Sequence, residues 1–203
     1  MSAFERIHVP ADVVAALARG DRAAAAEVYR ALSSVVFTLA LRLLADRQLA
    51  NEVTQDTFVD VIERAGTVES PGAFVGWVRS IAINRCLMRL RSPWYRRRLP
   101  WSDADADDRG AAAARLDGFG DLERALRQLS PDARFVVWMH HVEGHTHAEI
   151  ARLTGKSESY SKSQLKRAHA RLLAWRTEND DGRSNAAAPC GGAAHATDGG
   201  AAG

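Results

Sequence analysis

Residues 146–175 read THAEIARLTGKSESYSKSQLKRAHARLLAW and decide the fold of the C-terminal half of the chain. Thr146 and Glu149 have the spacing of a capping box, in which two side chains satisfy backbone N–H groups at the start of a helix. Gly155 can end that helix in a left-handed conformation, and the serines after it can cap a second helix that runs to about Trp175. Two helices joined by a short turn that contains glycine are typical of a helix-turn-helix.

The second helix of this unit carries the residues that we expect to read DNA. In a helix-turn-helix, the second helix enters the major groove with its N-terminal residues against the base edges. Ile150, Leu165, Ala168 and Leu172 can face the core. Lys and Arg side chains can bond to guanine or to phosphate, and Ser and Tyr hydroxyls can bond to base edges or to phosphates. The positions left for DNA are Ser159, Tyr160, Lys162, Ser163, Lys166 and Arg167. The alternative is a small helical bundle with one basic face.

The rest of the chain also has the pattern of helices. It shows neither β-type alternation nor an internal repeat of about 20–50 residues. Ser70-Pro71 and Ser130-Pro131 have the pattern of helix starts, with serine as the cap and proline at the first helical position. The helices expected outside the helix-turn-helix cover Ala11–Tyr29, Glu27–Leu44, Gln48–Ala65, residues 71–92, Asp121–Leu126 and Asp132–His141.

Two segments lack this apolar periodicity. Residues 96–120 read RRRLPWSDADADDRGAAAARLDGFG, which is typical of a flexible linker. Residues 177–203 have too little apolar content to fold, and we expect a disordered tail. The predicted fold is therefore all-α, with two small helical domains at residues 1–95 and 121–176 joined by the linker.

The composition restricts the class of protein. At 46% hydrophobic and 26% charged residues, the chain has the composition of an ordinary globular protein. Its N-terminus lacks the pattern of a secretion signal, and no apolar run reaches the roughly 20 residues that cross a bilayer. Cys86 and Cys190 stand in unrelated contexts and do not form a disulfide framework. We expect a cytoplasmic protein that is not inserted in a membrane.

Positive charge is concentrated in one segment. Between Pro71 and Trp101 there are seven arginines and no Asp or Glu, and the acidic run SDADADD follows directly. Trp94 and Tyr95 also lie in this basic segment, which favours a polyanion such as nucleic acid as the partner. The alternative is a solvated helix end that the acidic run balances.

The helix expected over residues 71–92 has two faces. Its apolar side includes Ala82, Ile83, Cys86, Leu87 and Leu90. A large aromatic, an amide and an arginine on the other side suit unstacked bases, which proteins recognise by stacking and by hydrogen bonds to their edges. That side comprises Trp77, Ser80, Asn84, Met88 and Arg91, with Arg79, Arg85 and Arg89 placed to hold phosphates.

Two stretches resemble a known family. WVRSIAINRCLMRLR is similar to the promoter-melting helix of the extracytoplasmic-function (ECF) sigma factors, and residues 122–172 resemble their C-terminal helix-turn-helix. The resemblance covers about Ala25 to Ala174. It implies a subunit of bacterial RNA polymerase that binds the core enzyme at the clamp helices of the largest subunit and at the flap. The N-terminal domain would open and read the minus-ten promoter element, with the loop Thr67–Phe74 forming a pocket for a flipped base. The C-terminal domain would read the minus-thirty-five element.

The stretch LANEVTQDTF, residues 49–58, departs from the family. The family usually carries the pattern Asp-Ala-Glu-Asp here, and this acidic surface docks on the clamp helices. Leu49 and Asn51 replace two of its acids. By the resemblance, the residues left for docking are Asn51, Glu52, Gln55 and Asp56.

Thr54 stands at a position where the family has an apolar residue. Phosphorylation adds roughly −1.5 to −2 charge units, about what the two missing acids would supply. We therefore hypothesise that a Ser/Thr kinase activates the factor at Thr54 or, as the second choice, Thr57. The alternatives are that Thr54 substitutes for valine in the core, and that an anti-sigma factor controls the protein.

Other functions have less support. His140, His141, His145 and His147 are close in sequence, but no Cys or Glu stands at zinc-ligand spacing, so we expect no metal and no cofactor. The chain has no phosphate-binding glycine loop and no triad spacing, and we expect no enzymatic activity. Two alternatives remain open: a free-standing helix-turn-helix regulator, and a nucleic-acid enzyme or metal protein built on the histidines.

Overall fold

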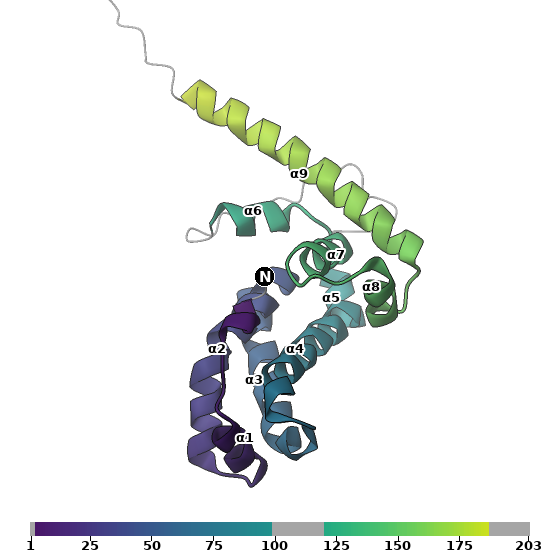
Figure 1. Ribbon diagram of the computed structural model, residues 1–203. Helices are drawn as coiled ribbons and strands as arrows, with labels where there is room; N and C mark the ends of the chain where they lie inside the picture. The colour runs from purple at the N-terminus through teal and green to yellow at the C-terminus, as the bar shows by residue number, and fades with distance from the viewer. Residues whose placement is uncertain (1–2, 99–119, 187–203) are drawn as a thin grey trace, which may run out of the picture.

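A computed structural model describes residues 3–98 and 120–186 (Figure 1). Every regular element in these two ranges is a helix, which confirms the all-α prediction. The N-terminal domain contains the 3₁₀-helices η1 (Ala3–Arg6), η2 (Ala65–Thr67) and η3 (Pro71–Ala73), and the α-helices α1 (Ala11–Ala18), α2 (Arg22–Leu44), α3 (Arg47–Arg64), α4 (Phe74–Arg91) and α5 (Pro93–Arg98). The C-terminal domain contains α6 (Asp121–Arg127), α7 (Pro131–His141), α8 (His147–Thr154) and α9 (Glu158–Ala186).

Helix α2 is the central helix of the N-terminal domain and packs against α1, α3 and α4. It starts at Asp21, whose carboxylate accepts hydrogen bonds from the backbone N–H groups of Ala23 and Ala24. Leu32, Val36 and other apolar side chains of α2 are fully buried, and each contributes about 1.5–3 kcal/mol to folding. Among the described residues, α2 is also the one helix long and apolar enough to cross a membrane, but its place in this core identifies it as the core helix of a folded domain.

The C-terminal domain follows the predicted cap chemistry. Thr146 and Glu149 form the reciprocal capping box of α8, and Gly155 ends that helix at φ +66°. Ser130 accepts a hydrogen bond from the N–H of Ala133 at the start of α7, and Ser157 accepts one from the N–H of Tyr160 at the start of α9. These contacts confirm the helix-turn-helix.

The helix boundaries differ from the prediction at four places. A turn at Gly20 (φ +83°) and the cap at Asp21 divide the helix expected over Ala11–Tyr29. The Ser70 side chain makes no cap hydrogen bond, because η3 precedes α4. Residues 96–98, assigned to the linker, belong to α5, and α9 continues to Ala186 instead of ending near Trp175. The remainder of the linker and tail assignments, residues 99–119 and 187–203, lies outside the described residues.

Candidate nucleic-acid and polymerase interface

The exposed face of α4 carries the side chains predicted for unstacked bases. Ser80, Asn84 and Met88 are exposed, and Trp77 is half-buried beside Phe74, with ring centroids 5.9 Å apart. On the opposite side, Ala82 and Cys86 are fully buried. Burial raises the pKa of the Cys86 thiol to about 12, so this cysteine is an inert core residue.

Two arginines predicted to hold phosphates are paired with carboxylates of α3 instead. Arg85 donates from Nε to Asp60 Oδ2 at 2.6 Å and from Nη2 to Asp60 Oδ1 at 2.5 Å. This hydrogen bonding is the main cause that lowers the pKa of Asp60 and raises that of Arg85. Arg89 Nη2 lies 3.3 Å from Asp56 Oδ2 and 3.4 Å from Glu52 Oε2. These ion pairs join α4 to α3.

Arg79, also predicted to hold a phosphate, and Arg91, predicted for the base-facing side, contact the C-terminal domain. Arg79 Nε lies 2.7 Å from Glu143 Oε2, and Arg79 Nη2 donates to the carbonyl oxygen of Glu143 at 3.0 Å. Arg91 Nη2 donates to the carbonyl oxygen of Leu153 at 2.8 Å. All four arginines of α4 predicted for minus-ten DNA are therefore engaged within the chain.

The docking positions on α3 have lost most of their free negative charge. Asn51 and Gln55 are exposed, whereas Glu52 and Asp56 are half-buried beside Arg89. Leu49, at the first acidic position of the family pattern, is buried. The two acids that remain in this cluster thus share one cation from the same domain, which offsets one of their two charges.

An apolar continuation of this face was missed by the sequence reasoning. Val59 is 52% exposed and Ile62 is 50% exposed. They follow Gln55 at intervals of four and three residues, which places them on one stripe of α3 with Gln55 and Asn51. That spacing was a signal in the sequence. Val59 and Ile62 were nevertheless not among the residues predicted for docking.

The structure places both candidate phosphorylation sites in the interior. Thr54 is 5% exposed and Thr57 is 0% exposed. The Thr54 hydroxyl donates to the carbonyl oxygen of Ala50 and the Thr57 hydroxyl to that of Val53, each at 2.7 Å. A hydroxyl that is buried and bonded within its own helix is closed to a kinase, so these threonines act as core residues in the folded protein.

Five of the six residues predicted for minus-thirty-five DNA lie on the exposed surface of the recognition helix α9. They are Ser159, Lys162, Ser163, Lys166 and Arg167. The sixth, Tyr160, is turned toward its own domain: its hydroxyl donates to Asp132 Oδ2 at 2.6 Å, and Lys156 Nζ lies 5.4 Å from the ring centroid. Ser161 and Gln164 of the same helix are buried. They therefore belong to the core of this unit.

The histidines of the C-terminal domain bond to each other and to the protein. His141 Nε2 lies 3.0 Å from His169 Nε2, and His147 Nδ1 lies 2.9 Å from the Ser161 hydroxyl oxygen. Burial is the main cause that lowers the pKa of His141, His145 and His147. In residues 3–98 and 120–186, no group of three or more His, Cys, Asp or Glu side chains is arranged to hold a metal ion.

Two family models match the chain, one in each domain. Sigma-70 region 2 matches residues 28–96, and Sigma-70 region 4 matches residues 119–172. The N-terminal match excludes the alternative of a helix-turn-helix regulator with an unrelated first domain. The two matches place α3 and α4 within region 2, and α7, α8 and the part of α9 up to residue 172 within region 4.

Curated relatives agree with this assignment. The ECF RNA polymerase sigma factor SigM of Mycobacterium tuberculosis is 29% identical over 163 residues, which cover 80% of this chain and 82% of SigM. SigK of Mycobacterium bovis is 28% identical over 153 residues, covering 72% of this chain and 82% of SigK. The solved complex of CnrH with the cytosolic domain of CnrY aligns with 82% of this chain and 96% of that chain at 20% identity and a TM-score of 0.47. The order of the two regions, together with the relatives SigM and SigK, shows that the chain belongs to the extracytoplasmic-function family of RNA polymerase sigma factors.

Proposed function

We propose that this sigma factor binds core RNA polymerase and reads a promoter at two elements, one with each domain. One observation carries the proposal: each domain presents an exposed helix face with side chains suited to DNA. On α4 that face contains Trp77, Ser80, Asn84 and Met88, and on α9 it contains Lys162, Ser163, Lys166 and Arg167. The first set suits unstacked bases, and the second suits the edges and phosphates of a duplex.

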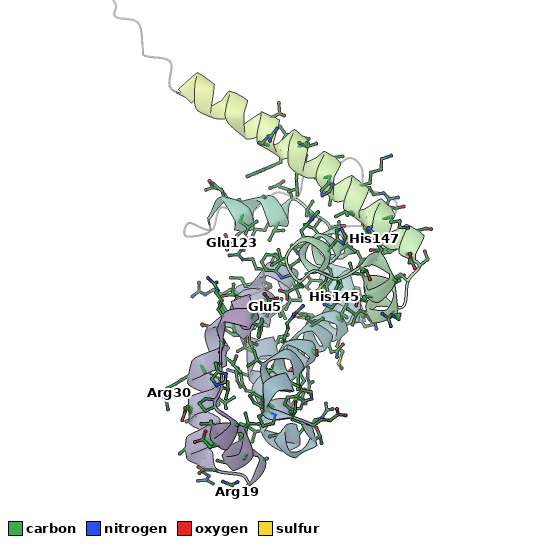
Figure 2. The ribbon with its side chains drawn as sticks, in the orientation of Figure 1. Glu5, Arg19, Arg30, Glu123, His145 and His147 are labelled. Atoms are coloured by element: carbon green, nitrogen blue, oxygen red, sulfur yellow. The ribbon has the colours of Figure 1, made fainter. Side chains whose placement is uncertain are left out.

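Run-off transcription with purified core polymerase tests the two assignments. The template carries a promoter selected by the reconstituted holoenzyme. We expect Asn84→Ala to lower promoter opening and Lys166→Ala to lower promoter binding, each by about tenfold. Arg30→Ala is the matched control, because Arg30 is exposed on α2 and points away from both DNA faces (Figure 2). Full activity of both variants would contradict the proposal.

We further propose that α3 docks on the polymerase through the stripe of Asn51, Gln55, Val59 and Ile62. Arg85 and Arg89 offset two of the three negative charges of Glu52, Asp56 and Asp60 beside this stripe. A docking surface with little net charge depends on the burial of apolar area, and about half of each of the Val59 and Ile62 surfaces is available for that. Polymerase binding should therefore depend weakly on salt.

The kinase hypothesis has less support than the docking proposal. Phosphorylation of Thr54 or Thr57 would place a dianion among the packed side chains between α3 and α2, so α3 would have to unfold locally first. The alternative given by the sequence, threonine in place of valine, accounts for both residues. Control by an anti-sigma factor and the cytoplasmic location remain predictions.

A further inference from the structure

The two domains are held together by Arg134, on α7. Its side chain is 4% exposed. Its Nε atom donates to the carbonyl oxygen of Leu43 at 3.0 Å, and Nη2 donates to the carbonyl oxygen of Leu44 at 3.3 Å and to the Tyr95 hydroxyl oxygen at 3.4 Å. All three acceptors belong to the N-terminal domain, so Arg134 crosses the domain boundary.

The partners of Arg134 explain why a cation is tolerated there. Leu43 and Leu44 are the last two residues of α2. The last carbonyl groups of a helix have no partner within the helix and carry the negative end of its dipole. Arg134 thus caps α2 from the other domain.

The same partners also limit the stability of this contact. Two carbonyl groups and one hydroxyl accept from Arg134 in the described structure, and none of these acceptors is a carboxylate. Burial is the main cause that lowers the pKa of Arg134. A buried guanidinium without a carboxylate loses much of its hydration energy, which the charge-assisted hydrogen bonds offset. Because the loss of hydration opposes the hydrogen bonds, this contact is weaker than a salt bridge to a carboxylate would be and can open.

Further contacts at this boundary involve residues proposed for DNA. Glu143, just before α8, holds Arg79, and the carbonyl group of Leu153, near the end of α8, holds Arg91. His145 also lies at this boundary, with Nε2 3.4 Å from Arg79 Nη2 (Figure 2). Arg79 at this boundary is neutralised by a carboxylate, and Arg91 is held by a carbonyl group near the end of α8.

A fourth contact lies at the C-terminal end of α2. Arg42 Nη2 lies 2.7 Å from Glu123 Oε1, and the Arg42 guanidinium lies 5.3 Å from the Trp138 ring centroid. Arg42 and Arg134 therefore connect the end of α2 to both α6 and α7.

We infer that the free protein is autoinhibited: its helix-turn-helix domain closes over Arg79 and Arg91 of α4, and Arg134 holds this closed state. Opening releases Arg79 and Arg91 and separates the two DNA-reading faces. The inhibitory consequence rests on the proposed function, because Arg79 and Arg91 flank the face of α4 that is assigned to promoter DNA. A partner that binds the open state better shifts the population toward it.

Small-angle X-ray scattering of the full chain tests closure without polymerase or DNA. Arg134→Glu places a carboxylate against carbonyl oxygens, and Glu143→Lys places an ammonium against Arg79. We expect both variants to have a larger radius of gyration than the wild type. Arg176→Glu is the control, because it makes the same charge change as Arg134→Glu at an exposed position of α9, and its radius should equal that of the wild type.

Circular dichroism of the same samples verifies folding. If Arg134→Glu loses helical signal, Glu143→Lys decides the question alone. An unchanged radius of gyration in the folded interface variants would overturn the inference.

DNA affinity of the free protein tests inhibition. Fluorescence anisotropy with a forked oligonucleotide that exposes one strand should show about tenfold tighter binding by Arg134→Glu than by Arg176→Glu. Equal affinity despite a larger radius would show that the closed state does not inhibit and would overturn the inference. If the holoenzyme fails to initiate transcription while the scattering result holds, the proposed function fails and the closed state stands.

Discussion

Arg85 and Asp60 join α4 to α3 through two parallel hydrogen bonds, with Nε–Oδ2 at 2.6 Å and Nη2–Oδ1 at 2.5 Å. The pair fixes the helix that carries Trp77 and Asn84 against the helix proposed to dock on the polymerase. An arginine first assigned to DNA phosphate is thus a positioning residue of the region 2 domain.

Asp60→Asn should therefore lower the free energy of unfolding by about 1.5 kcal/mol. Urea denaturation at pH 7 measures this loss, and Glu63→Gln, on the exposed side of the same helix, is the control. The pKa of Asp60 is lowered in the folded state, mainly by its hydrogen bonds from Arg85. The contribution is fully present above the unfolded pKa, 3.8, and is lost as the pH falls through the folded value. Equal losses in both variants would show that the pair contributes nothing specific.

Acidification from pH 7.5 to 5.5 should destabilise the C-terminal domain. Burial lowers the pKa of His141, His145 and His147 in the folded state, so the unfolded chain binds more protons below pH 6.5, the ordinary histidine value. Stability is therefore highest above that pH and decreases as the pH falls toward the folded pKa values. Thermal melts across this range measure the slope. The double variant His141→Gln and His147→Gln should flatten it, and an unchanged slope would assign the effect to other groups.

Thr54→Val should leave stability within about 0.5 kcal/mol of the wild type, because it fills the same core site without a hydroxyl. Thr54→Glu should cost about 3 kcal/mol or more, because it buries a charge between packed helices. Urea unfolding and a pull-down on core polymerase measure the two properties. A folded Thr54→Glu protein that bound polymerase more tightly than the wild type would restore the kinase hypothesis.

Ile62→Asp should weaken binding to core polymerase by about tenfold while leaving the fold intact, since the side chain is half exposed. Leu173→Asp, at an exposed apolar position of α9, controls for the charge and for the lost apolar surface. Fluorescence titration against core polymerase at two salt concentrations gives the affinities. If the Leu173 variant binds as weakly as the Ile62 variant, the docking stripe is assigned to the wrong helix.

Tyr160→Phe should remove the hydrogen bond to Asp132 and lower the free energy of unfolding by about 1 kcal/mol. Its affinity for a minus-thirty-five duplex should stay near that of the wild type. Lys166→Ala should show the reverse pattern, with weaker DNA binding and unchanged stability. A Tyr160→Phe protein that kept its stability but lost DNA affinity would return Tyr160 to the DNA face.

The sequence by itself determined the features that depend on neighbours along the chain. The capping box at Thr146 and Glu149, the left-handed Gly155 and the two faces of α4 follow from spacing within one helix or turn, so they were predictable. The burial of Thr54 followed from the sequence only as the alternative to phosphorylation. A threonine on an apolar stripe is compatible with a core position and with an exposed phosphorylation site.

Only the tertiary structure decided which charged groups meet. Arg79 and Glu143 are separated by 64 positions and Arg134 and Leu43 by 91, and local periodicity carries no information about such partners. The four arginines of α4 were therefore assigned to DNA as if free, although packing between helices and between domains gives each of these four an acceptor. Charge composition indicates that a polyanion can bind. The packing of the domains decides which cations are available to bind it.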